Sequence, residues 1–134
     1  MVVEDKIALS FAELTLIKEG LVLIDYYGEE RINVSKGIEM HNAIIKLTNN
    51  NSYFLIHNFG DNYVHLTEAM RFMTSQLNME VHKILGRAYV GTNAATRLAI
   101  NNLIKLYKPL VPAKLFSEIE PSVKWAEDFI TSAK

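Results

Sequence analysis

The amino-acid sequence predicts an α/β domain with a mixed, mostly parallel sheet of about five strands. Short apolar runs alternate with amphipathic helical patterns, the first two apolar runs follow each other directly, and Gly, Pro or Asn marks most boundaries. The expected order is β-β-α-β-α-β-α-β-α, with an antiparallel hairpin at the start and helices packed on the sheet. At 134 residues, the chain fits a single domain, 1–134.

Composition narrows the classes of protein further. Apolar residues make up 49% of the chain and charged residues 22%, with a net charge of −1, which excludes a disordered chain and argues against a nucleic-acid binder. The absence of cysteine excludes disulfides, thiolate nucleophiles and cysteine-ligated zinc. No apolar run approaches the ~20 residues of a membrane span, and the N-terminus lacks a signal-peptide pattern. We therefore expect a cytoplasmic protein.

The first elements are strands. Residues 7–17 are rich in strand formers, but their alternation changes phase between Phe11 and Leu14. A period of two cannot slip without a break, so this stretch predicts one irregular strand or two short ones. Glu19-Gly20 forms a turn, and Leu21–Tyr27 follows as the second arm of an antiparallel hairpin.

A helix and a buried strand come next. Asn33 and Ser35 are both suitable helix caps. The apolar stripe behind them has the spacing i, i+3, i+4, i+7 and consists of Met40, Ala43, Ile44 and Leu47. The helix should end at Thr48–Asn51. Tyr53–His57 is nearly all apolar, as expected for a strand that is covered on both faces.

A loop over residues 58–65 contains the turn signal Gly60-Asp61-Asn62. Thr67 is a good N-cap for a following helix. Its apolar positions are Leu66, Met70, Met73 and Leu77.

The rest of the chain predicts strand, helix, strand, helix. Arg87–Val90 is a strand between two glycines, and Thr92 or Asn93 caps the next helix. The stripe of that helix is Ile100, Leu103, Ile104 and Tyr107, before Pro109 and Pro112 stop it. Ala113–Phe116 is a short last strand.

The final helix begins after residue 116. Ser117 and Glu120 have the spacing of a capping box, and Pro121 fits the first turn. The apolar face consists of Trp125, Ala126, Phe129 and Ile130.

This second half resembles a known fold. The stretches that carry the resemblance are Gly86–Gly91, Ala95–Tyr107, Lys108–Phe116 and Pro121–Ala126, in particular Pro112, Lys114, Leu115, Phe116 and Trp125. They are similar to the STAS-like fold of bacterial anti-sigma-factor antagonists, and specifically to its uncharacterised SpoIIAA-like branch. The resemblance implies a STAS-like domain that acts by binding another protein. Its motif consists of packing and turn residues, so it supports fold better than function.

The resemblance also implies a regulatory loop. Regulatory STAS proteins are phosphorylated on a serine where the third strand passes into a helix. The corresponding stretch here is residues 58–67, and its candidate regulatory or interaction residues are Asp61, Tyr63, His65 and Thr67. Thr67 suits a simple N-cap, and a phosphate at a helix N-terminus would also be stabilised there.

The residues suggest two candidate ligand sites, one for an anion and one for a metal. Thr92 and Asn93 lie between a strand and a helix, where backbone N–H groups can hold an anion, and Arg97 can reach back toward it. His57 and His65 flank the loop that contains Asp61 and could converge on a metal, although the histidine spacing matches no zinc motif. The commoner role for such loop residues is to solvate a turn, so we expect no metal and no cofactor.

No catalytic constellation or Gly-x-Ser-x-Gly elbow is present, which favours a non-enzymatic regulatory or protein-interaction module. Its partner would bind at a sheet edge or at the face around Tyr63–Thr67. An edge strand of the initial hairpin could also form a homodimer. The alternatives are a carrier of a small hydrophobic ligand or lipid, in a pocket lined by Met70, Met73 and Tyr89, and an unrecognised hydrolase that uses His57 and His65.

Overall fold

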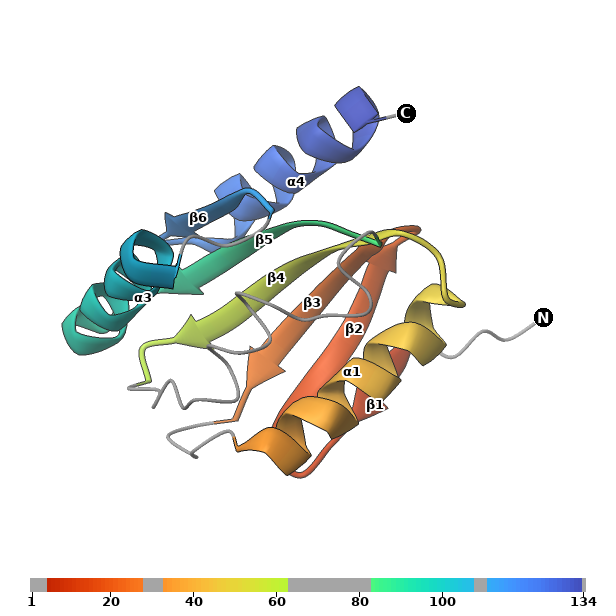
Figure 1. Ribbon diagram of the computed structural model, residues 1–134, viewed down its shortest axis with the longest axis horizontal. Coiled ribbons are helices and arrows are strands. Elements are labelled where there is room, and N and C mark those ends of the chain that lie inside the picture. Colours follow the sequence, from red (N-terminus) through yellow and green to blue (C-terminus); the bar gives the residue numbers. More distant parts are fainter. Residues whose placement is uncertain (1–4, 28–32, 63–82, 108–110, 134) are drawn as a thin grey trace.

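The computed structural model describes residues 5–27, 33–62, 83–107 and 111–133, and these form a mixed sheet with helices on both of its faces (Figure 1). The sheet has six strands, which lie side by side in the order in which they occur along the chain, from β1 to β6. The predicted α/β class is confirmed, with one strand more than expected.

The additional strand comes from the phase change near the N-terminus. The stretch forms two short strands, β1 (Lys6–Ala8) and β2 (Ala12–Lys18), which pair antiparallel. The break between them is a turn in which the Leu9 N–H donates to the Ala12 carbonyl over 2.8 Å, while the side chain of Phe11 is buried. β3 (Leu21–Tyr26) pairs antiparallel with β2, as the hairpin pattern predicts.

The other three strands are parallel to β3 and to one another. They are β4 (Tyr53–Gly60), β5 (Ile84–Gly91) and β6 (Ala113–Phe116). β6 has the predicted bounds, and the first five residues of β4 are buried, as predicted for a doubly covered strand. β4 continues beyond His57 into the expected loop because Asn58 pairs with Asp25 on one side and with Val90 on the other.

Three helices lie in the described residues: α1 (Val34–Thr48), α3 (Ala94–Tyr107) and α4 (Ile119–Ala133). The side chain of Asn33 accepts a hydrogen bond from the Lys36 N–H over 2.9 Å, so it caps α1. Beyond Thr48, Asn49 and Asn50 adopt left-handed backbone angles, with φ of 54° and 60°, which end the helix where the sequence predicts.

The capping box predicted for the last helix is replaced by another contact. α4 begins at Ile119, and the Ser117 hydroxyl accepts a hydrogen bond from Arg97 over 3.1 Å. Pro121 lies in the first turn of α4, as predicted. The predicted helix that starts at Thr67 falls outside the described residues.

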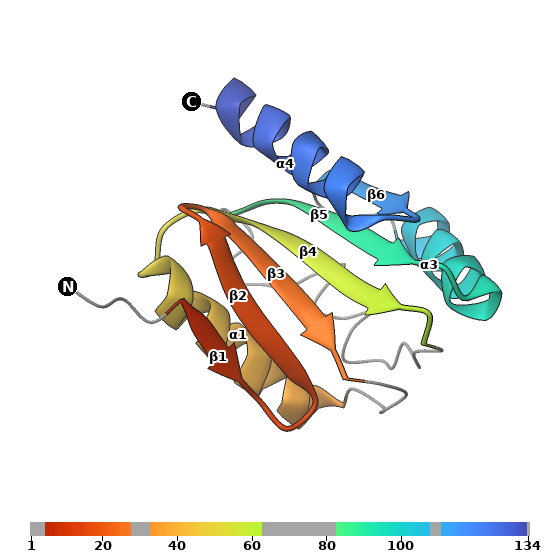
Figure 2. The same ribbon diagram turned by 180° about the vertical axis from the view of Figure 1, so that it is seen from behind.

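The sequential strand order determines which face each helix covers. Parallel crossovers are almost always right-handed. When every crossover steps in the same direction along the sheet, right-handed connections place their helices on one face. α1 and α3 both lie on that face, whereas α4, which follows the last strand, lies on the other (Figures 1 and 2).

Each face has its own core. The α1/α3 face buries the predicted apolar stripe of α1, together with Leu14, Ile24, Leu55 and Ile100. On the α4 face, the Phe54 ring meets Trp125 edge-on, with the ring centroids 5.3 Å apart, and it also contacts Phe129 at 5.8 Å. Ala126 is fully buried at this contact, so the predicted apolar face of the last helix is the one that packs on the sheet.

One helix is too narrow for the α4 face. Six strands at ~4.8 Å spacing span roughly 24 Å, whereas a helix with its side chains is roughly 10–12 Å across. α4 packs against β4, β5 and β6 and also buries Leu21 at the start of β3, but no helix of the described ranges covers the same face of β1, β2 and the end of β3 (Figure 2). We call this uncovered part of the α4 face the open half-face. None of the helices described above is both long and apolar enough to cross a membrane.

Candidate functional site

A row of polar groups lies inside the α1/α3 core, on three adjacent strands. The Tyr26 hydroxyl lies 2.9 Å from His57 Nδ1, and Arg87 Nη1 lies 3.1 Å from His57 Nε2. The same hydroxyl lies 3.6 Å from Met40 Sδ on α1. His57 is only 1% exposed. The row could not be predicted from the sequence, because its members come from β3, β4, β5 and α1.

The direction of each hydrogen bond follows from the chemistry of the groups. A guanidinium has donors and no acceptor, so His57 Nε2 must accept from Arg87. A neutral imidazole then carries its proton on Nδ1, which donates to the Tyr26 oxygen. The Tyr26 hydroxyl is left to donate to the Met40 sulfur. The row therefore holds His57 in a single tautomer.

Burial shifts the titration of both groups. Desolvation, and secondly the nearby Arg87 cation, holds the pKa of His57 well below its ordinary value of 6.5. Desolvation raises the pKa of Tyr26 far above its usual range, against the opposing influence of Arg87. Both side chains are thus uncharged in the folded protein at neutral pH.

Aromatic rings continue the row. Tyr89 stacks on His57 with the centroids 5.0 Å apart, and Tyr26 stacks on Phe59 at 4.8 Å. Of the residues proposed to line a lipid pocket, Tyr89 is fully buried in this stack, whereas Met70 and Met73 lie outside the described residues. For the hydrolase alternative, His57 does meet a hydroxyl, that of Tyr26, but in the core and not in a cleft; His65 lies outside the described residues.

The candidate loop is described only at its start. The Asp61 carboxylate accepts a hydrogen bond from the Thr92 hydroxyl over 3.0 Å, and the Thr92 N–H donates to the Gly60 carbonyl over 2.9 Å. Asp61 thus joins the end of β4 to the end of β5. Tyr63, His65 and Thr67 lie outside the described residues, so their regulatory role stays a prediction.

The residues of the candidate anion site bind protein groups. The Asn93 side chain accepts from the N–H groups of Ala95 at 2.9 Å and Thr96 at 3.2 Å, so it, and not Thr92, caps α3. Arg97 Nη1 lies 2.7 Å from the Gly91 carbonyl and 3.2 Å from the Phe116 carbonyl. These three residues therefore tie α3 to the ends of β5 and β6, and anion binding by them stays a prediction.

This geometry makes Arg97 a structural residue with a measurable effect. We expect Arg97→Ala to lower the free energy of unfolding by about 1–3 kcal/mol, because two carbonyl oxygens at partly buried strand ends lose a charged donor. Arg97→Lys should restore only part of this, since one ammonium cannot reproduce the planar donor geometry. Urea unfolding measures the loss, with Lys105→Ala on the exposed side of the same helix as the control. An Arg97→Ala protein as stable as the control would contradict this role.

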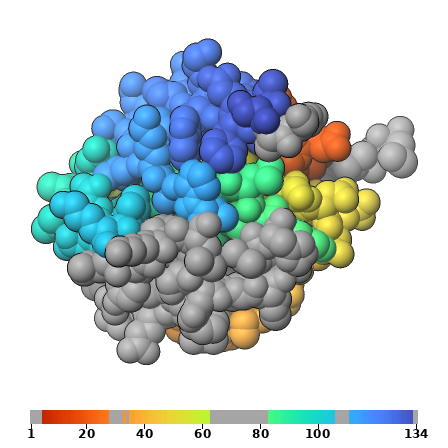
Figure 3. Space-filling model, turned by 45° about the horizontal axis from the view of Figure 1, so that its top comes forward, coloured from red at the N-terminus to blue at the C-terminus, as the bar shows by residue number. Residues whose placement is uncertain are grey.

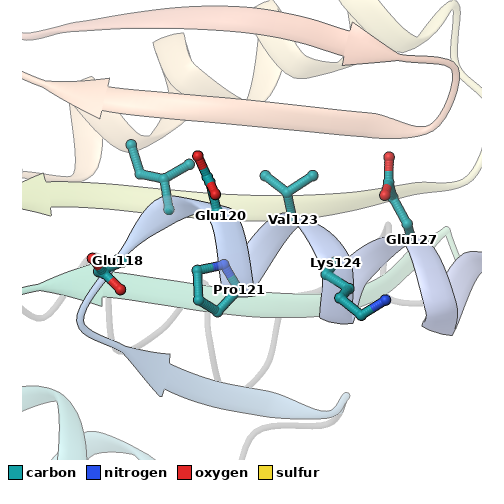
Figure 4. A pocket seen from close by; sticks show the side chains of 7 residues that line it. Glu118, Glu120, Pro121, Val123, Lys124 and Glu127 are labelled. Atoms are coloured by element: carbon teal, nitrogen blue, oxygen red, sulfur yellow. The ribbon is translucent and has the colours of Figure 1, made fainter.

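A shallow depression of about 950 Å³ runs along α4 beside the open half-face. Glu120, Val123 and Glu127 point from α4 toward the β2–β3 hairpin, whereas Pro121 and Lys124 point to the other side (Figure 4). At the C-terminal end of the depression, Lys18 of β2 lies 3.5 Å from the Glu127 carboxylate. We call the depression and the adjoining strands the α4 groove.

The strand side of the α4 groove carries polar side chains in register. Glu13 is directly opposite Asp25, which is in turn opposite Asn58. The Asn58 amide donates to the Asp25 carboxylate over 2.7 Å. Like charges placed opposite each other in a sheet repel, so the pair of acids gives this end of the groove a negative potential. Periodicity places Glu13 on the face opposite Leu14, but the sequence did not show that this face lacks a helix.

The structure brings no metal ligands together in the parts of the chain that it describes: no three of the His, Asp and Glu side chains there are placed to share an ion. On the outside of the molecule, the surface of α4 adjoins the surfaces of β6 and α3 (Figure 3). The functional features of the described residues are therefore an exposed groove and a row of polar groups in the core, in which uncharged Tyr26 and His57 are followed by the Arg87 cation.

Comparison with known proteins gives one match. The model of a family described as a domain of unknown function, DUF7793, matches residues 15–130. No curated protein and no solved structure matches the chain. The matched range runs from β2 to α4 and so includes both sides of the α4 groove. Because the match covers most of the sequence, the chain belongs to the DUF7793 family.

Proposed function

We propose that the protein is a non-enzymatic, cytoplasmic protein-interaction module, and that its partner binds in the α4 groove. The observation that carries this proposal is the open half-face: on the α4 side of the six-stranded sheet, β1, β2 and the end of β3 lack a covering helix among the described residues. These strands pair antiparallel, and an antiparallel sheet can leave one face open to water. A surface of this kind, next to a helix with a defined groove, suits a docked segment of another protein.

The sheet edges suit a partner less well than the groove does. β1 has three residues and β6 has four, and each includes an exposed lysine, Lys6 and Lys114 respectively. Short, lysine-bearing edge strands are features that discourage edge-to-edge pairing. Homodimer formation through β1 stays a prediction, and we place the main binding surface on the face.

The STAS-like resemblance is part of the same proposal. It is supported by the strand–helix–strand–helix order of β5, α3, β6 and α4 and by the packing of Trp125 against Phe116, with centroids 5.6 Å apart. Phe116 and Trp125, two of the residues that carry the resemblance, thus hold α4 on the sheet. In this proposal they serve the binding surface by positioning α4, without contacting the partner.

Site-specific crosslinking tests the proposal. A photoreactive amino acid at Thr15, on the open half-face, is expected to capture a discrete protein in the native host, because a docked segment would cover this position. The matched control is the same amino acid at Glu39, an exposed position of α1 on the other side of the sheet. Mass spectrometry identifies the adduct and the crosslinked peptide. Absence of an adduct at 15, or equal capture at 39, would contradict the proposal.

A further inference from the structure

We infer that the occupant of the α4 groove is a basic amphipathic helix of the partner protein, with an apolar stripe flanked by Lys or Arg. This inference rests on the proposed function and names the chemistry of the partner. Three properties of the groove support it: its charge, its apolar floor and its width.

The charges around the groove are unequal. Five acids border it, from the strands, from the residue before α4 and from α4 itself: Glu13, Asp25, Glu118, Glu120 and Glu127. The bases are Lys6 opposite Thr15, Lys18, which is paired with Glu127, and Lys124, which points away from the strands. Four of these acids lie at one end of the groove, where β3 ends and α4 starts: Glu13, Asp25, Glu118 and Glu120. A cationic side chain there would relieve the repulsion between Glu13 and Asp25.

The floor of the groove is apolar and partly accessible. Leu23 lies on the α4 face of β3, and Val123 and Ile119 lie on α4; all three are half-buried and pack at the margin of the Phe54 core. Side chains in this state still expose apolar surface to water. A partner that covered them would gain hydrophobic free energy in addition to the ionic contacts.

The width of the open half-face suits a helix. Helices pack with their axes roughly 8–10 Å apart, so a second helix beside α4 would lie above β2 and β3. That position is the one that a covering helix of the domain itself would occupy in a sheet with both faces filled. An extended peptide would cover only a third to half of this width, because a strand is roughly 4.8 Å wide in the plane of a sheet.

Three synthetic peptides test the inference against the full chain. The first has leucines at i, i+3, i+4 and i+7 and lysines at the other positions. The second replaces every lysine with glutamate, and the third scrambles the first so that the stripe is lost. We expect saturable binding of the first peptide, measured by fluorescence anisotropy, and at least about tenfold weaker binding of the other two. Amide chemical-shift changes should be confined to β2, β3 and α4.

Charge reversal provides the matched variants. Glu13→Lys with Glu120→Lys is expected to weaken the first peptide about tenfold, whereas Glu39→Lys on α1 should leave its affinity within about twofold. Thermal unfolding verifies that each variant is folded; if the double variant is not, Glu120→Gln alone serves, with a smaller expected loss. Absence of saturable binding up to about 1 mM, equal binding of the acidic or scrambled peptide, or shifts confined to α1 and α3 would each overturn the inference.

The two proposals fail separately. A protein crosslinked at Thr15 through an acidic or extended segment, or through a second copy of this chain, would overturn the inference of a basic helix. If the captured segment is acidic or extended and belongs to another protein, the proposed interaction function would stand. Absence of any crosslinked partner would remove the proposed function itself.

Discussion

Below about pH 6.5, the stability of the protein is expected to fall by up to about 1.4 kcal/mol for each pH unit because of His57 alone. In the unfolded chain this imidazole takes up a proton near its ordinary pKa of 6.5, whereas burial and Arg87 hold its pKa in the folded protein well below that value. Between the two pKa values only the unfolded state binds the proton, so acid favours unfolding. Above about pH 7 both states are neutral and the contribution of His57 to the pH dependence disappears.

Urea unfolding between about pH 4.5 and 7.5 measures this dependence. Because carboxylates also titrate at the lower end of the range, the informative quantity is the difference between proteins. His57→Gln is expected to reduce the slope of stability against pH, although it lowers stability at pH 7 by removing the bonds to Tyr26 and Arg87. His41→Gln, on a partly exposed position of α1, is the control for the removal of an imidazole elsewhere in the chain. Equal slopes in all three proteins would show that His57 titrates normally.

Gly86→Ala is expected to destabilise the protein by about 1–3 kcal/mol. A β-carbon at this position would lie 2.6 Å from Cε2 of the Phe54 ring and 3.2 Å from the Pro112 carbonyl oxygen. The ring cannot move away freely, because Trp125 meets it edge-on and Phe129 contacts it as well. The added methyl group must therefore displace α4 or the start of β5, and thermal or urea unfolding measures the loss.

A second glycine of the same strand provides the matched control. A β-carbon at Gly91 would meet its nearest atom, the Gly60 carbonyl oxygen, at 3.6 Å, which is an ordinary contact, so Gly91→Ala should cost much less. The cause can be isolated with a double-mutant cycle. In a Phe54→Leu background the clash is removed, and Gly86→Ala should then cost less than in the natural protein. Additive losses would show that Phe54 is not the group that excludes a side chain at Gly86.

Local features of the fold could be predicted from the sequence. Asn33 caps α1, Asn49 and Asn50 end it, and Ala113–Phe116 forms a strand with the predicted bounds. Each of these depends on side-chain and backbone chemistry within a few residues. The same locality explains the differences: β4 continues to Gly60 because two neighbouring strands supply partners for Asn58, and a pattern within one segment does not contain that information.

The candidate sites could be predicted less well because they depend on contacts between distant segments. His57 is 31 positions from Tyr26 and 30 positions from Arg87, and only strand order and register bring them together. The sequence predicts Arg97 as an anion ligand because the residue lies one helical turn after Asn93. The carbonyl oxygens of Gly91 and Phe116 that it binds instead are brought to it only by the ends of β5 and β6. The open half-face likewise follows from the direction of the crossovers.

The sequential strand order also has a consequence for how the chain can fold during synthesis. Each strand pairs with the strand made just before it, so every new strand adds to an existing edge without waiting for a later segment, and domains fold from the N-terminus as they emerge. The exception is the face of Phe54, Ile56 and Ala88, which α4 covers. Until the last helix emerges from the ribosome, this apolar face has no cover from α4. We therefore expect this second core to form only after α4 has been synthesised.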